Sequence, residues 1–317
     1  MELRADSEKL GDNQPTIMVT LLGEYFVNRK WFSLCAETWN LAKLSYPIYI
    51  LNDGSLTMGS QEKLVSMGFI VTPDTDVNEA VNSVLSNYPV IREMRKKSNL
   101  FKKIIDTSVF FREKILYVDS DVLFKKRFIL PNDPPSLLFC IDDVPGYGGS
   151  WQVPLRYPIV NGLNSGFVYF NPNIIDLDYL EYICHNYLIM SKNIWWLEQT
   201  CWAILAARIQ EKGIFEGRDA CVISGLNKRT PDEIKLNKTT YFRRNKSISE
   251  LENIEFLIRD AAVVHFAGPG KRWIEPIYEK IIDNFAEQKV SQLKWQNVEN
   301  ANWKEKLLIG LRMLLKG

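Results

Sequence analysis

The stretch ILYVDSDVLF, residues 115–124, decides the fold. It runs from apolar residues into two acidic ones, Asp119 and Asp121, and then into a second apolar group. Such an apolar run predicts a buried strand, and ligands of open α/β sheets bind beyond the carboxyl ends of the strands. Because residues i and i+2 of an extended chain project to the same side, we expect both carboxylates to face one point.

The sequence on either side alternates between strand-like and helix-like patterns. Apolar runs predict strands, and apolar residues at mixed three- and four-residue spacing predict helices. The predicted strands cover residues 17–22, 47–55, 69–73, 115–124, 163–172 and, as the last of them, 261–268, with predicted helices at 31–41, 61–69, 99–111 and around Trp202. Strands that alternate with helices imply an α/β fold with a mostly parallel central sheet.

The composition is that of a folded protein with balanced charge. Of the 317 residues, 46% are hydrophobic, which is ample for a core. Lysine and arginine number 39 against 38 acidic residues, so the basic excess of a protein that coats nucleic acid is missing and we expect no such partner. No internal repeat or low-complexity linker divides the chain. We therefore predict one domain at residues 14–290, followed by an amphipathic helical tail at 291–317.

Cysteine usage and the absence of apolar leader segments bear on location. The five cysteines lie far apart without a CxxC pair, which favours neither a zinc ribbon nor a disulfide framework and fits a reducing compartment. The first 14 residues lack the apolar core of a signal peptide, and no apolar run approaches the roughly 20 residues that span a bilayer. We expect a cytoplasmic protein.

The tail NWKEKLLIGLRMLLKG, residues 302–317, combines leucines at helical spacing with interspersed lysine and arginine. Two interpretations are open. The helix could rest on the cytoplasmic face of a membrane as a peripheral contact, or it could dock on its own domain as amphipathic helices of soluble folds do.

The acidic pair itself indicates a cation site. Two carboxylates that face one point repel each other unless a cation or a proton lies between them, and hard divalent cations prefer oxygen ligands. Two acids that merely end a strand in solvent are the simpler alternative. A second enzyme class also fits, because phosphatases of the haloacid dehalogenase type carry a strand that ends in D-x-D. In those phosphatases Thr or Val occupies the position of Leu123, and their motif lies near the start of the chain, whereas here it lies in the middle.

A second group of residues points to a metal and a diphosphate together. In AAVVHFAGPGKRW, residues 261–273, His265 follows an apolar strand, and Gly268 and Lys271 come after it at three-residue steps. Imidazole is a good ligand for manganese, so His265 beside two carboxylates would complete a metal site. Gly268 permits close backbone approach, and Lys271 offers a point charge to phosphate oxygens.

Taken in order, ILYVDSDVLF, LNSGFVYFNP, LEQT and HFAGPGKRW resemble the motifs of retaining glycosyltransferases of family 8, which include glycogenin and a bacterial lipooligosaccharide galactosyltransferase. The resemblance covers residues 16–275. It implies a GT-A fold with a Rossmann-like nucleotide-binding sheet, a divalent cation (Mn²⁺ or Mg²⁺), and a nucleotide-sugar donor that is commonly a UDP-sugar. The expected activity is transfer of a hexose to a glycan, glycolipid or protein acceptor with retention of anomeric configuration.

The resemblance also implies roles for individual residues. Asp119, Asp121 and His265 match the metal ligands, whereas Gly268 and Lys271 match the residues on the donor diphosphate. The remaining matches are Lys102 (or its neighbour Lys103) at a basic donor-contacting position, Asn164 and Ser165 at the pair that contacts the donor sugar, Asp142 (or Asp143) at an acid near the sugar and acceptor, and Glu198 with Gln199 at the acid–amide pair beside the anomeric carbon.

Departures from the family pattern limit the prediction. Family members end their first strand with an acid that reads the base, whereas this chain has Gly23 and Glu24 there. The usual KPW ending is KRW, which adds Arg272. Because Gln199 is a poor nucleophile, we expect front-face attack through an oxocarbenium-like state rather than a double displacement. A degenerate fold kept as a binding module is the non-enzymatic alternative.

Overall fold

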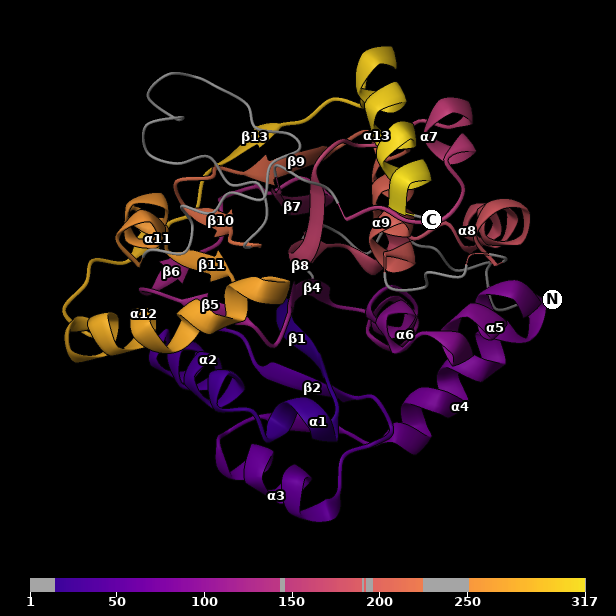
Figure 1. Ribbon diagram of the computed structural model, residues 1–317. Helices are drawn as coiled ribbons and strands as arrows, with labels where there is room; N and C mark the ends of the chain where they lie inside the picture. Colours follow the sequence, from indigo (N-terminus) through magenta and orange to yellow (C-terminus); the bar gives the residue numbers. More distant parts are fainter. Residues whose placement is uncertain (1–14, 143–145, 190, 192–195, 225–250, 317) are drawn as a thin grey trace.

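The computed structural model describes residues 15–142, 146–189, 191, 196–224 and 251–316 (Figure 1). The strands are β1 (Thr16–Leu22), β2 (Ile48–Asn52), β3 (Ile70–Thr72), β4 (Lys114–Val118), β5 (Val122–Phe124), β6 (Phe128–Ile129), β7 (Leu137–Ile141), β8 (Leu163–Phe170), β9 (Lys212–Phe215), β10 (Ala220–Val222), β11 (Val263–His265), β12 (Ser291–Gln292) and β13 (Trp295–Asn297). The helices are α1 (Glu24–Val27), α2 (Lys30–Leu41), α3 (Met58–Ser66), α4 (Asp74–Val84), α5 (Pro89–Lys97), α6 (Lys102–Phe110), α7 (Gln152–Arg156), α8 (Leu177–Ile183), α9 (Leu197–Ala206), α11 (Leu251–Ile258), α12 (Ile274–Ile281) and α13 (Trp303–Lys316).

An eight-stranded sheet forms the centre of the molecule, in the order β13-β9-β7-β8-β4-β1-β2-β3. The half formed by β3, β2, β1 and β4 is parallel throughout, and β7 pairs with β9 in parallel. β8 runs antiparallel to both of its neighbours, β4 and β7. The predicted α/β class with a mostly parallel sheet is therefore confirmed.

Residues of β1 alternate between the two faces of this sheet, because successive side chains of a strand point to opposite sides. Met18 and Leu22 join a core cluster with α2, α12 and the three-stranded sheet β10-β11-β5. Ile17 and Val19 join a second cluster with α4, α5, α6 and α9. Figure 1 shows α2 and α12 on one side of the sheet and α4, α5, α6, α8 and α9 on the other. Both faces are thus covered, which leaves the ends of the strands for a ligand.

The strand order changes direction beside β4. From β1 the chain adds β2 and β3 on one side, and β4 returns to the other side of β1. In doubly wound sheets such a switch point opens a crevice at the carboxyl ends of the strands. The turn between β4 and β5, which carries Asp119 and Asp121, lies at this point.

Asn164 and Ser165 belong to β8, within the strand predicted at residues 163–172. Two sequence-based expectations differ from the structure. Residues 115–124 form two strands with a turn between them, so Asp119 and Asp121 do not lie on one extended segment. The segment 261–268 is followed by two further strands, of which β13 pairs with β9 in the central sheet. The proposed division after residue 290 thus falls ahead of a strand of the main sheet, and the helical part of the tail begins at Trp303.

No helix within the described parts of the chain has both the length and the apolar character that crossing a bilayer requires.

Candidate metal centre

The two acidic residues lie in a tight turn at the carboxyl end of β4. The N–H of Val122 donates to the carbonyl of Asp119 at 3.0 Å, and the N–H of Asp119 donates to the carbonyl of Gly166 in β8 at 2.7 Å. This turn, rather than strand alternation, brings the carboxylates together. Asp121 is buried, and the side chain of Asp119 is 18% exposed, so the pair opens to solvent on the Asp119 side.

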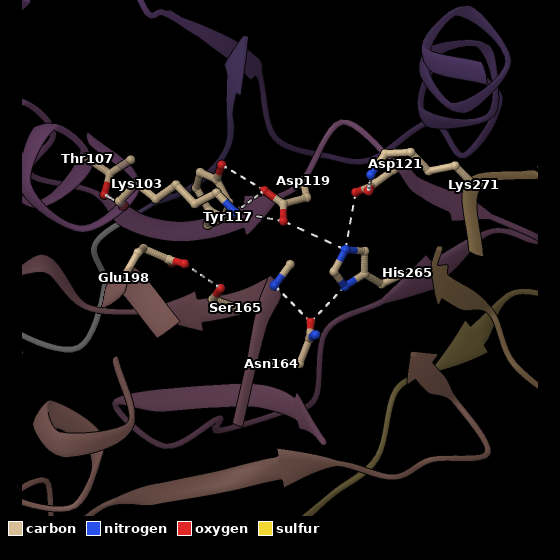
Figure 2. A network of polar contacts seen from close by, with 11 residues as sticks. Lys103, Thr107, Tyr117, Asp119, Asp121, Asn164, Ser165, Glu198, His265 and Lys271 are labelled. Carbon is tan, nitrogen blue, oxygen red and sulfur yellow. Dashed lines mark hydrogen bonds and ion pairs between the residues drawn. The ribbon is translucent and has the colours of Figure 1, made fainter. Parts of the chain in front are cut away.

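His265 reaches the acidic pair from β11. This strand pairs antiparallel with β5, and His265 lies opposite Val122. Its Nε2 is 3.2 Å from Asp121 Oδ1 and 3.7 Å from Asp119 Oδ2 (Figure 2). One ligand atom from each of the three residues lies within 4.8 Å of the others.

Asn164 fixes the orientation of the imidazole. Its Oδ1 accepts the backbone N–H of Gly166 at 3.0 Å, which identifies this atom as the oxygen of the amide. The same Oδ1 lies 2.7 Å from His265 Nδ1, so Nδ1 carries the proton and donates it. When His265 is neutral, its lone pair is therefore on Nε2, which faces the two carboxylates. This is the arrangement in which outer partners of a metal-binding histidine set its tautomer.

Glycine at position 166 makes room for the ring. A Cβ there would lie 2.1 Å from His265 Cε1 and 2.2 Å from Nδ1, far inside contact distance. No side chain larger than hydrogen fits between β8 and the imidazole while the ring keeps this place.

A lysine holds each carboxylate from a different side. Lys103 of α6 places Nζ 2.7 Å from Asp119 Oδ1, and Tyr117 donates to the same oxygen at 3.1 Å. Lys271 places Nζ 2.5 Å from Asp121 Oδ2. Burial alone would lower the pKa of Lys103, but Asp119 and Glu198 raise it to about 12. Burial alone would raise the pKa of Asp121, but His265 and Lys271 lower it below its ordinary value. Asp121 is therefore a carboxylate at neutral pH.

Next to this group lies a buried carboxyl, Glu198 of α9. Its Oε2 accepts the hydroxyl proton of Ser165 at 3.0 Å, whereas Oε1 is buried without a hydrogen-bond partner among the described residues. Burial and the nearby charge of Asp119 raise its pKa to about 7, against the opposing effect of Lys103. A buried oxygen without a partner is costly, and a ligand hydroxyl would satisfy it. Gln199, the next residue of α9, contacts the start of β8, where its Nε2 donates to the carbonyl of Leu163 at 2.8 Å.

The structure separates the two adjacent lysines of α6, which sequence reasoning left open. Lys103 contacts the acidic turn, whereas Lys102 donates to the carbonyl of Asp53 at the end of β2, at 2.5 Å. Lys103 is therefore the lysine at the candidate metal centre. Tyr117, which sequence reasoning missed, could have been found as the residue that precedes Asp119 by two positions.

Asp53 is the other residue that the sequence analysis missed, because the Asn-Asp-Gly segment looks like an ordinary turn. Its Oδ2 occupies the space beside Gly23, where an added Cβ would lie 2.2 Å from that oxygen. Glu24 is engaged elsewhere: it accepts from the N–H of Thr57 at 2.9 Å and the hydroxyl of Ser60 at 2.8 Å at the start of α3. The carboxylate beside Gly23 is therefore that of Asp53, which follows β2, and not that of Glu24.

Gly268 and Asp142, which the sequence analysis also named, are each held by their local backbone, and two tryptophans lie near the start of α9. Gly268 has a φ of 52° and begins the short helical turn that carries Lys271, so glycine is needed there for its backbone. Asp142 is buried at the end of β7, where its N–H donates to the carbonyl of Gly162 at 2.8 Å. Trp202 is a core residue, and the Trp196 ring packs against Gly146. Asp143 and Trp195 lie outside the described residues.

The three candidate ligands suit a divalent cation. Ligand oxygens and nitrogens around a manganese or magnesium ion are separated by about 3 Å when metal–ligand distances are about 2.1 Å. The distances of 3.2 and 3.7 Å from Nε2 to the two carboxylates are close to that spacing. A neutral imidazole would face the two carboxylates with its lone pair, and a cation between the three ligands would remove that repulsion. The two lysines contact the carboxylates from the outer side.

Comparisons with known proteins identify the type of fold. No protein-family model and no curated protein matches the sequence. Among solved structures, the bifunctional glycosyltransferase WbbM is similar with a TM-score of 0.51 and 14% identity over 87% of this chain. The chain has a GT-A-type glycosyltransferase fold. It spans half of the WbbM chain. An active-site mutant of LgtC is similar with a TM-score of 0.48 and 13% identity, over 86% of this chain and all of LgtC.

Proposed function

We propose that this protein is a metal-dependent glycosyltransferase that moves a hexose from a nucleoside-diphosphate sugar to a glycan, glycolipid or protein acceptor, with retention of anomeric configuration. The observation that carries the proposal is the convergence of Asp119, Asp121 and the Nε2 lone pair of His265 at the switch point of a GT-A-type sheet. The motif resemblance to family 8 supports it, and Mn²⁺ or Mg²⁺ is the proposed ion.

The metal would be held by the two carboxylates and His265, and when bound it would supply Lewis-acid stabilisation to the diphosphate leaving group. Lys271 lies beside Asp121 and is 31% exposed, so its ammonium is available to phosphate oxygens on the solvent side. Gly268 begins the helical turn that carries Lys271, and because it has no side chain a phosphate could approach its backbone closely. These residues form the proposed diphosphate site, with Lys102 and Lys103 on its opposite flank.

The donor sugar is proposed to lie over β8 and the start of α9. Glu198 Oε1 would accept a sugar hydroxyl, since it has no other described partner, and Ser165 holds the second oxygen of the same carboxyl in place. The proposed sugar site also includes Asn164 at the start of β8, Gln199 in the first turn of α9 and Asp142 directly after β7. With its carboxyl held in this way, Glu198 is a positioning group for hydroxyls rather than a nucleophile. This supports front-face attack, with the acceptor proton passing to a departing phosphate oxygen.

The proposed carrier nucleotide is UDP. A carboxylate accepts the N3–H of uracil or the hydroxyls of ribose, and Asp53 is the acid at the edge where a nucleoside attached to this diphosphate site would extend. Among the described residues, Asn99 Nδ2 donates to its Oδ2 at a long distance of 3.4 Å. A cytoplasmic location remains a prediction from sequence.

The decisive experiment is hydrolysis of UDP-sugars by the purified chain with Mn²⁺, with a chelator, and in Asp121→Ala. The proposal expects metal-dependent release of UDP that Asp121→Ala abolishes, together with transfer to added sugar acceptors. Release of inorganic phosphate from simple monoesters would instead identify the haloacid dehalogenase alternative. Nucleotide binding without any turnover would identify a binding module.

A further inference from the structure

Helix α2 is hydrogen-bonded to the strand that follows the acidic turn of the candidate metal centre. Trp39 Nε1 donates to the carbonyl of Val122 at 2.8 Å, and Thr38 Oγ1 accepts the N–H of Phe124 at 3.1 Å. Both bonds tie the helix to β5, which begins directly after Asp121. The position of α2 relative to Asp121 is therefore fixed by contacts with the backbone of β5.

The first turn of α2 contacts the segment that carries Lys271. The Nζ of Lys271 lies 5.4 Å from the centroid of the Trp31 ring. The neighbouring Lys30 forms an ion pair with Glu275 in the first turn of α12, four residues after Lys271. Trp31 is partly buried, and its ring packs against that of Phe26 with 6.0 Å between the centroids. The indole ring is thus held next to the ammonium by its own helix and by a second aromatic ring.

The ammonium of Lys271 has two partners of different kinds. Its Nζ is 2.5 Å from Asp121 Oδ2, so a carboxylate holds it on one side and the Trp31 ring on the other (Figure 2). Asp121 is also a candidate metal ligand, and its attraction for the ammonium is weaker once a divalent cation shares the carboxylate. A cation–π contact depends on the quadrupole of the ring and not on Asp121, so this contact remains when the metal site is filled.

Two other cations close in sequence contact different aromatic rings. The guanidinium of Arg29 lies 3.9 Å from the centroid of the Tyr25 ring, and that of Arg272 lies 5.1 Å from the centroid of the Trp273 ring. Among the residues that the structure describes, the cation over the ring of Trp31 is that of Lys271. The contact is therefore specific to the lysine of the proposed diphosphate site.

We propose that Trp31 is a positioning residue for Lys271. Its ring keeps the ammonium at the rim of the metal centre when Asp121 binds a cation, so that Lys271 is already ordered when a diphosphate binds. Ordering a lysine side chain costs conformational entropy, and a side chain that is ordered beforehand avoids this cost on binding. The inference rests on the proposed function, because Lys271 is the proposed contact of the donor diphosphate.

Calorimetry of inorganic diphosphate with the Mn²⁺-loaded chain tests this inference separately from sugar transfer. Trp31→Leu keeps an apolar side chain but removes the ring, and it should weaken diphosphate binding about fivefold, within the range for ordering one long side chain. Trp31→Phe keeps an aromatic face and should recover part of that loss. In the Lys271→Ala background, Trp31→Leu should cause no further loss, because the ring then has no ammonium to hold.

The matched control is Trp303→Leu on α13, because Trp303 also has a lysine over its ring, with Lys304 Nζ 5.7 Å from the centroid. This variant should leave diphosphate affinity unchanged. Trp31→Leu should also keep the wild-type affinity for Mn²⁺ alone, which a general loosening of α2 and the acidic turn would lower.

The outcomes separate this inference from the proposed function. Wild-type diphosphate affinity in Trp31→Leu, an equal loss of affinity in the Lys271→Ala background, or a parallel loss of Mn²⁺ affinity would overturn the role of Trp31 and leave the proposed diphosphate site standing. Absence of diphosphate binding by the wild-type chain with Mn²⁺ would overturn both.

Discussion

His265 Nδ1 donates to Asn164 Oδ1 across 2.7 Å, and this bond joins residues that are 101 positions apart in the chain. Because Oδ1 also accepts the N–H of Gly166, the amide cannot turn to present its nitrogen without losing a backbone hydrogen bond. Asn164 thereby directs the Nε2 lone pair at Asp119 and Asp121. The side chain serves the candidate metal centre without lying among its three ligands.

Asn164→Ala should therefore weaken Mn²⁺ binding by about 10- to 100-fold, the usual effect of removing the partner that orients a metal-binding histidine. Titration calorimetry of the purified chain measures this directly. Asn164→Asp keeps an oxygen acceptor at the same place and should bind more tightly than the alanine variant. Equal affinities for Asn164→Ala and the wild type would show that the ring is oriented by its packing alone.

Gly166→Ala tests the packing of the same ring. A Cβ at this position would overlap the imidazole at 2.1 Å, so either His265 moves or β8 shifts. We expect a loss of about 1–3 kcal/mol in the free energy of unfolding and a loss of Mn²⁺-induced stabilisation in thermal melts. The matched control is Gly217→Ala, where a Cβ would meet nothing within 4 Å. If Mn²⁺ stabilised Gly166→Ala as much as it stabilises the wild type, the imidazole of His265 would lie elsewhere in solution.

Glu198 predicts a pH dependence of stability. Its pKa in the folded protein is about 7, above the ordinary value of 4.5, so the folded state favours the neutral carboxyl. The stabilising contribution of this protonated form is complete below pH 4.5 and is lost as the pH rises through about 7. Relative to the wild type, Glu198→Gln should therefore gain about 3 kcal/mol in the free energy of unfolding between these limits. Urea denaturation of both proteins at several pH values, in the presence of a chelator, measures the difference.

The control for that experiment is Glu79→Gln, a substitution at an exposed glutamate of α4. Its difference from the wild type should stay constant across the same pH range. If the Glu198→Gln difference is equally flat, the carboxyl is solvated in solution and the proposed sugar contact through Oε1 loses its basis.

The strand and helix pattern was largely predictable because it depends on local periodicity. The apolar runs at residues 17–22 and 115–118 specify buried strands wherever the rest of the chain lies. The Asp119, Asp121 and His265 group was also predictable, since Asp119 and His265 close apolar strands and Asp121 follows Asp119 by two positions. The reason for its geometry was wrong, because a backbone hydrogen bond from Val122 to Asp119 forms a turn that periodicity does not reveal.

Contacts between distant segments could not be predicted in the same way. Lys102 and Lys103 are equivalent in the sequence, and only the rotation of α6 against the sheet sends one to Asp53 and the other to Asp119. The close approach of Gly166 to His265 depends on how β8 and β11 meet, which no local pattern records. Motif resemblance supplied the relevance of Asn164 but not the hydrogen bond through which it acts.

Asp53→Asn tests the proposal that β2 supplies the acid for the donor nucleoside. The substitution keeps the shape of the side chain beside Gly23 but replaces one acceptor oxygen by a donor, so a hydroxyl or N3–H of the nucleoside loses its partner. We expect UDP to bind about tenfold more weakly in the presence of Mn²⁺, as measured by calorimetry, whereas inorganic diphosphate should bind as it does to the wild type. Glu24→Gln is the control. Glu24 is committed to Thr57 and Ser60, so this substitution should leave nucleotide affinity unchanged.

Comparison of UDP with GDP, CDP and ADP in both proteins then separates contact with the base from contact with the ribose. A uniform loss of affinity across the four nucleotides indicates contact with the ribose, and a loss confined to UDP and GDP indicates contact with the base. Unchanged UDP affinity in Asp53→Asn would remove this residue from the donor site and return the question of base recognition to the β1 edge.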